Sequence, residues 1–147
     1  MPENPIAVKT IVTTEIAAKV AKEYNCEIVD VLTGFKFIGE VIKNYEAAGK
    51  TDGFILGFEE SYGYLLGSYA RDKDAVAGSM LAAEMVCSHY AEGRTVYQAL
   101  QNIYNEYGIY KESVLNVKIT GIDPMGLMGE IMSDIRKKSV ESIGGMK

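Results

Sequence analysis

Short apolar runs alternate with longer amphipathic stretches along the first seventy residues. The runs 7–12 (AVKTIV), 27–32 (EIVDVL) and 53–58 (GFILGF) are apolar and rich in β-branched residues, and each predicts a buried strand. A fourth strand is predicted over 62–69 (YGYLLGSY). The order strand–helix–strand–helix–strand predicts an α/β layer sandwich in which the early strands pair in parallel. The last two strands are too close in sequence for a crossover helix, so we expect them to be antiparallel.

Two helices are predicted between the first three strands. Thr13 or Thr14 is expected to cap the first, with Glu15 in its first turn, where a carboxylate suits the helix dipole. Thr33–Gly34 is expected to open the second, with Thr33 as its cap. The apolar residues of this second helix recur on one side: Ile38, Val41, Ile42 and Tyr45.

Two more helices are predicted after the fourth strand. Asp72 is expected to be the N-cap of a long helix. Apolar residues recur along that helix at helical spacing and predict a core-facing stripe: Val76, Met80, Ala83, Cys87 and Tyr90. Thr95 with Gln98 three residues later is a capping-box pattern, and Gly108 fits the end of the helix that it starts.

The last forty residues predict one further strand and helix. Residues 113–120 (SVLNVKIT) are strand-like, and Asp123–Pro124 is a cap followed by a proline at the first helical position. We therefore expect a domain over 6–108, a linker strand and helix over 109–138, and a flexible tail over 139–147.

Composition narrows the classes of function. The chain has 147 residues and a net charge of −5, from 15 basic and 20 acidic residues, which argues against nucleic acid as its main partner. It has no apolar run long enough to span a membrane and no secretory signal pattern at its start. Its two cysteines, Cys26 and Cys87, are too few for a disulfide framework and predict reduced thiols in a cytoplasmic protein.

Three loops carry the candidate chemistry, at the ends of strands where open α/β sheets bind ligands. In 32–37, Lys36 lies in the first turn of a helix, where a cation opposes the dipole unless an anion lies between it and the free N–H groups. In 57–63, two adjacent carboxylates and a hydroxyl form a set of acceptors suited to sugar hydroxyls. In 71–74, Arg71 and Lys73 add positive charge. Each loop by itself is also compatible with a solvated turn.

Taken in order, TGFKFIG, GFEESYG and RDKD resemble the third domain of the α-D-phosphohexomutases (phosphoglucomutase/phosphomannomutase), on the phosphoglucomutase and phosphopentomutase side, and KTIVTTE upstream adds support. The resemblance implies a three-layer α/β/α sandwich with a mixed four-stranded sheet. It also implies an enzyme of four domains that interconverts 1- and 6-phosphosugars through a phosphoserine and a bisphosphorylated intermediate.

The resemblance also implies roles for individual residues. Glu59 and Ser61 match the residues that bind sugar hydroxyls, and Thr33 and Gly34 match a loop that lies against the sugar. Lys73 matches a lysine near the reacting phosphoryl group. The remaining cations, Arg71 and Lys36, are expected to give electrostatic support, and Glu60 receives no role.

The family's serine nucleophile motif and its magnesium loop are not in the sequence. The resemblance therefore implies that the chain is a sugar-recognition fragment that is inactive alone and binds no metal. Mg²⁺ and glucose 1,6-bisphosphate would belong to the full-length enzyme, and domains I, II and IV of the same protein would be its partners. Two alternatives stay open: the same domain of a phosphopentomutase, and a stand-alone module that binds phosphosugars without catalysis.

Overall fold

The computed structural model describes residues 2–113, 117–138, 142 and 145. The chain divides into two compact units, Met1–Glu112 and Ser113–Lys147. The first unit contains the sheet and four of the α-helices of the described chain, and the second contains one. The finer boundaries expected from the sequence stay predictions.

The sheet has four strands in the order β2-β1-β3-β4. They are β1 (Ile6–Thr10), β2 (Glu27–Val31), β3 (Phe54–Phe58) and β4 (Tyr64–Leu66), with a 3-10 turn, η1 (Thr51–Gly53), before β3. β1 pairs in parallel with β2 and with β3, whereas β3 and β4 are antiparallel. The predicted pairing is thus confirmed, although β4 is much shorter than its apolar run.

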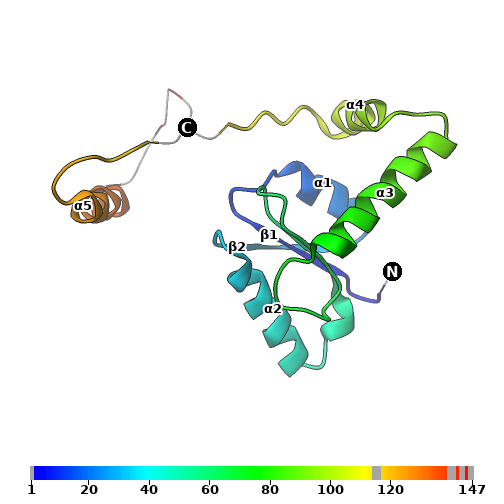
Figure 1. Cartoon of the computed structure of the whole chain (residues 1–147), viewed down its shortest axis with the longest axis horizontal. Coiled ribbons are helices and arrows are strands. Elements are labelled where there is room, and N and C mark those ends of the chain that lie inside the picture. Colours follow the sequence, from blue (N-terminus) through cyan, green and yellow to red (C-terminus); the bar gives the residue numbers. More distant parts are fainter. Residues whose placement is uncertain (1, 114–116, 139–141, 143–144, 146–147) are drawn as a thin grey trace. The chain divides into compact units, whose positions relative to one another are not determined.

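Two helices cover opposite faces of the sheet. α1 (Ile16–Glu23) joins β1 to β2, and α2 (Phe35–Ala47) joins β2 to β3 by passing over β1. The two connections run in opposite directions along the sheet, so right-handed crossovers place the helices on opposite sides. Figure 1 shows α1 on one side and α2 on the other, which is the expected three-layer arrangement.

The main core lies between the sheet and α2. The predicted apolar side of α2 is confirmed, because Ile38 and Ile42 are fully buried and Val41 and Tyr45 pack against the core. The buried cluster consists of Ile6, Val8, Phe35, Ile38, Ile42, Phe54 and Leu65.

The starts of the first two helices differ from expectation by one residue. Glu15 is itself the N-cap of α1, not a first-turn residue, while the Thr14 hydroxyl accepts a hydrogen bond from the Ile16 N–H at 3.3 Å. Gly34, not Thr33, is the N-cap of α2. Its φ of +121° lies in a region that L side chains rarely adopt, so the glycine decides where the chain enters the helix.

The cap of α3 (Ala75–Ala91) was also expected at the wrong residue. Asp74, not Asp72, is the N-cap, and its Oδ1 accepts from the N–H groups of Val76 at 2.8 Å and of Ala77 at 3.3 Å. Asp72 instead accepts from the N–H of Lys73.

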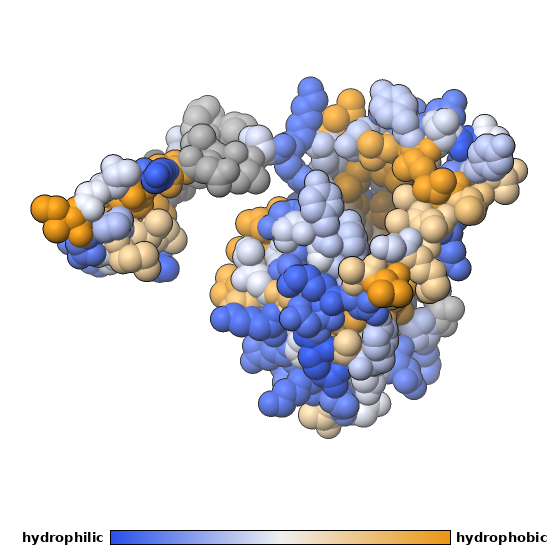
Figure 2. Space-filling model, viewed as in Figure 1, coloured by the Kyte–Doolittle hydropathy of each residue, from blue (hydrophilic) through white to orange (hydrophobic). Residues whose placement is uncertain are grey.

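The core stripe predicted on α3 is wrong, because Val76, Met80 and Tyr90 are exposed. Apolar residues lie all around this helix rather than on one side, so no single stripe is set by the pattern. Figure 2 shows apolar surface gathered over the α3 and α4 region. α4 (Val96–Tyr107) begins with the predicted capping box of Thr95 and Gln98 and ends at Gly108, with φ +93°.

In the second unit, α5 (Pro124–Lys137) starts as predicted. The Asp123 carboxylate accepts from the Gly126 N–H at 2.9 Å, and the proline occupies the first turn. The strand predicted over 113–120 is wrong for Ser113 and 117–120, which form no strand, whereas 114–116 lie outside the described residues. A strand needs a neighbour to pair with, and the described part of this unit holds none. The predicted tail, 139–147, lies largely outside the described residues.

Candidate functional site

Three loops leave the parallel strands at the same edge of the sheet. They follow β1 (residues 11–15), β2 (residues 32–34) and β3 (residues 59–63), and we call them together the carboxyl edge. Because β1 pairs in parallel with both neighbours, these loops must lie side by side. The sheet thereby brings together two of the three loops singled out from the sequence, 32–37 and 57–63.

Glu59 connects two of these loops. Its side chain is buried, with 6% exposure, and its Oε1 accepts a hydrogen bond from the Gly34 N–H at 3.1 Å. This N–H belongs to the N-cap of α2 and is one of the donors that a helix start leaves unpaired. The carboxylate therefore fixes the loop after β3 to the start of α2.

Glu60 connects the same loop to the end of β1. Its Oε2 accepts from the hydroxyls of Thr10 at 3.0 Å and of Thr13 at 3.3 Å, and these hydroxyls lie 2.7 Å from each other. Both threonines are buried. The adjacent carboxylates, which are unusual residues for a tight hairpin, are thus explained by two separate contacts.

Lys9 is a buried cation at this edge that sequence reasoning missed. Its side chain is fully buried, and Nζ lies 2.8 Å from both the Glu15 and the Asp30 carboxylates and donates to the Thr13 carbonyl at 3.1 Å. Burial lowers the pKa of Lys9, but the hydrogen bonds and charges of Asp30 and Glu15 outweigh it and leave the pKa above its ordinary value of 10.5. A lysine inside an otherwise apolar strand run was the available signal, because such a charge needs partners.

Lys73 reaches the carboxyl edge beside Gly63. A Cβ on Gly63 would lie 3.0 Å from Glu59 Oε2, 3.1 Å from Lys73 Cδ and 3.5 Å from the Phe35 ring. Lys73 Nζ lies 5.3 Å from the centroid of that ring and 3.3 Å from Asp72 Oδ1. Because Gly63 has no side chain, the Glu59 carboxylate, the Lys73 stem and the Phe35 ring can all lie close to this residue.

The tip of the loop after β3 is open to solvent. Ser61 is exposed, and Tyr62 is 88% exposed with a φ of +63°, which is uncommon for a residue other than glycine. Thr33 is exposed on the neighbouring loop. A ligand at this edge can therefore reach the Ser61 and Thr33 hydroxyls directly.

The other two predicted cations line a different hollow from Lys73. Arg71 pairs with Glu46 at 2.5 Å and donates to the carbonyls of Ser68 and Ala70. Arg71 and Lys36 line one hollow of about 640 Å³, whereas Lys73 lines another of about 530 Å³ with Tyr62 and Tyr64. The three predicted cations thus line two separate hollows.

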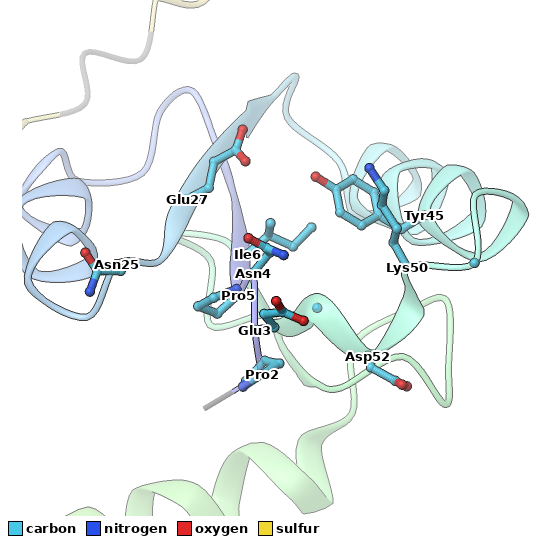
Figure 3. Close-up of a pocket in the computed structure, with 12 residues that line it drawn as sticks. Pro2, Glu3, Asn4, Pro5, Ile6, Asn25, Glu27, Tyr45, Lys50 and Asp52 are labelled. Atoms are coloured by element: carbon cyan, nitrogen blue, oxygen red, sulfur yellow. The ribbon is translucent and has the colours of Figure 1, made fainter.

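A larger hollow, of about 880 Å³, lies at the opposite end of the strands (Figure 3). Its polar groups come from the N-terminal segment, the start of β2 and the end of α2, and include Glu3, Glu27, Tyr45, Lys50 and Asp52. It contains none of the residues predicted to bind a ligand.

Neither a metal site nor a membrane span is found in the part of the chain that the structure describes. No group of three or more His, Cys, Asp or Glu side chains there could hold a metal ion. No described helix is both long and apolar enough to cross a bilayer.

Comparison with known families assigns the domain. Residues 1–107 match the model of phosphoglucomutase/phosphomannomutase, alpha/beta/alpha domain III. The chain belongs to this family. As domain III, it resembles the corresponding part of curated phosphoglucomutases: 36% identity over 139 residues with that of Staphylococcus saprophyticus, and 29% over 147 residues with that of Staphylococcus haemolyticus.

These alignments cover 95% and 100% of this chain but only 25% and 26% of the relatives, so this domain III spans about a quarter of their length. A solved structure from Thermus thermophilus, described as a phosphomannomutase, shares the fold. Its TM-score is 0.58 at 21% identity, and the match covers 72% of this chain and 22% of that one.

Proposed function

We propose that this chain is the sugar-recognition domain of a phosphoglucomutase or phosphomannomutase. The whole enzyme would interconvert hexose 1-phosphate and hexose 6-phosphate through a phosphoserine and a bisphosphorylated sugar. The observation that carries the proposal is the geometry of Glu59, which is held by the Gly34 N–H beside Gly63 and Lys73 in a domain of this family.

Four residues of the carboxyl edge have a chemical part in this proposal. Glu59 accepts hydrogen bonds from sugar hydroxyls, and the exposed Ser61 hydroxyl both donates and accepts. Two such groups on one short loop can read neighbouring hydroxyls in either orientation of the sugar. Thr33 and Gly34, in the loop after β2, border the space in which the sugar would lie.

Lys73 supplies positive charge next to this sugar-binding loop. Its stem lies against Gly63, so its ammonium can offset charge on a phosphoryl group attached to the same sugar. Lys36 and Arg71 act from the neighbouring hollow as electrostatic support.

The rest of the enzyme would supply the reaction centre. Magnesium does not fit the described residues of this chain, because they gather no suitable carboxylate cluster. Domains I, II and IV would contribute the nucleophile, the metal and the grip on the distal phosphate, and we expect this chain alone to be inactive. We also propose a cytoplasmic location, supported by two free cysteines, buried Cys26 and exposed Cys87.

An amide chemical-shift titration of this chain with glucose 1,6-bisphosphate, carried to millimolar concentration, tests the proposal. We expect shifts at 33–36, 57–63 and 71–74. Glucose alone and inorganic phosphate alone separate sugar contacts from anion contacts, and ribose 1,5-bisphosphate tests the pentose alternative.

Glu59→Gln is the decisive variant, with Glu84→Gln on the exposed surface of α3 as its matched control. The amide oxygen can still accept from Gly34, but it is a weaker acceptor for sugar hydroxyls, so affinity should fall about five- to tenfold. Equal binding by both variants, or shifts confined to the hollow at the other end of the strands, would contradict the assignment of Glu59.

A further inference from the structure

Glu60 is the residue of the sugar-binding loop for which neither the motif nor the proposed function gives a role. We propose that Glu60 is a positioning residue, which holds the loop 59–63 against the end of β1 through the hydroxyls of Thr10 and Thr13. This inference rests on the proposed function, because its purpose is to place Glu59 and Ser61 for the sugar.

The three oxygen atoms form a closed triangle. Glu60 Oε2 lies 3.0 Å from the Thr10 hydroxyl and 3.3 Å from the Thr13 hydroxyl, and the hydroxyls lie 2.7 Å apart. The two hydroxyl protons can fill two of these three contacts at a time, and a carboxylate, which only accepts, gives both protons an acceptor. A neutral side chain at residue 60 would remove the charge that makes these bonds strong.

The threonine side of this contact is held in place by the fold. Thr10 is the last residue of β1 and is fully buried. Thr13 is held by its carbonyl, which accepts from the buried Lys9 ammonium at 3.1 Å, and by its N–H, which donates to the Thr10 carbonyl at 2.9 Å. Glu60 therefore contacts the end of β1 and a loop residue that two hydrogen bonds hold against that strand.

The loop itself has few other restraints. Its backbone closes with the bond from the Glu59 N–H to the Gly63 carbonyl at 2.9 Å, and its tip, Ser61 and Tyr62, is exposed. The adjacent carboxylates extend to two different anchors, Glu59 to Gly34 and Glu60 to Thr10 and Thr13. Releasing the second anchor should leave the first intact but allow the tip to move, which lowers ligand affinity without loss of the fold.

Glu60→Gln tests this role by titration with glucose 1,6-bisphosphate. The affinity should fall about fivefold, because a neutral acceptor makes a weaker bond to the two hydroxyls. The combined variant Thr10→Val, Thr13→Val should weaken binding by a similar factor. Adding Glu60→Gln to that pair should cause no further loss, since all three changes break the same contact. Thr10→Ser with Thr13→Ser keeps both hydroxyls and should bind like the wild type.

A ligand-free readout separates positioning from a general loss of structure. In the wild type, the buried hydroxyl protons of Thr10 and Thr13 should give slowly exchanging, downfield NMR signals, as expected for donors to a carboxylate. These signals should shift upfield in Glu60→Gln, while the core amides of β1 and α2 remain unchanged.

The outcomes are distinguishable. A wild-type chain that binds neither bisphosphate nor sugar contradicts the proposed function. A wild-type chain that binds, with unchanged affinity in Glu60→Gln, overturns the positioning role. Additive losses for Glu60→Gln and the threonine pair also overturn it, because Glu60 would then act on the ligand by another route.

Discussion

Lys9 and Asp30 lie opposite each other in the parallel pair of β1 and β2, and the ammonium of one lies 2.8 Å from the carboxylate of the other. The Glu15 carboxylate, at the start of α1, also lies 2.8 Å from the Lys9 ammonium. The contact joins two strands and a helix at the edge where the loops meet. Lys9 is therefore both a structural cation and the support of the Thr13 carbonyl.

Lys9→Met should destabilise the domain by about 2 kcal/mol, because the buried stem is kept but the charge-assisted bonds are lost. Asp30 and Glu15 are half exposed, so water can solvate them after the change. Much of the lost stability therefore comes from the Thr13 carbonyl, which loses its hydrogen-bond donor. Urea unfolding followed by circular dichroism measures the change. Lys19→Met on the exposed side of α1 is the control and should be close to neutral.

Alkaline pH should also lower the free energy of unfolding of the wild type, because it removes the charge of Lys9. The pKa of Lys9 is raised in the folded chain, so its contribution is fully present below about pH 10.5 and is lost as the pH rises through the higher folded pKa. The free energy of unfolding, measured between pH 9 and pH 12, should fall more steeply for the wild type than for Lys9→Met. Parallel curves for the two proteins would show that Lys9 does not titrate in this way.

Gly63→Ala should directly disturb the loop after β3, residues 59–63. The new methyl group would lie 3.0 Å from the Glu59 carboxylate and 3.1 Å from the Lys73 stem, so one of them must move. We expect a loss of about 1–2 kcal/mol of stability and weaker binding of glucose 1,6-bisphosphate. Gly129→Ala in α5, where no atom lies within 4 Å of the new Cβ, is the control. Tight binding by Gly63→Ala would mean that the loop has room that the structure does not show.

Asp74→Ala should lower the melting temperature, and Asp72→Ala should lower it less. Asp74 caps α3 through the N–H groups of Val76 and Ala77. The Tyr69 hydroxyl, together with these N–H groups, lowers the pKa of Asp74. The cap is therefore present above the ordinary carboxyl pKa and is lost as the pH falls through the lower folded value.

Thermal unfolding of both variants at pH 7, and of the wild type between pH 2 and pH 5, measures this difference. A larger loss of melting temperature for Asp72→Ala than for Asp74→Ala would instead support Asp72 as the cap of α3, as the sequence pattern indicated.

The parts of this molecule that the sequence predicts well are those decided by near neighbours. The buried side of α2 follows from apolar residues three and four apart, and the Thr95–Gln98 box follows from two residues within one turn. In the run RDKD, two aspartates compete for one helix start, and only the path of the chain after β4 selects the second. α3 shows no stripe because its apolar residues lie all around it.

The contacts of the candidate site depend on tertiary structure. The Glu59–Gly34 bond joins residues 25 positions apart, and the Glu60–Thr10 bond joins residues 50 positions apart. The two carboxylates could be singled out because they are unusual in a hairpin. The partner of Glu60 follows from the strand order, which places the ends of β1 and β3 next to each other, and the partner of Glu59 follows from the path of α2 from β2 to β3.

The hydrogen bonds and ion pairs that build the carboxyl edge around Lys9, Glu59 and Glu60 begin and end between residues 9 and 63. They do not involve α3, α4 or the second unit. Residues 6–73, from the start of β1 to Lys73, therefore contain the carboxyl edge together with the lysine that lies against Gly63. A chimera that receives this segment from a relative should also receive that relative's loop geometry. We expect its preference among sugar hydroxyls to follow the relative that supplied the segment.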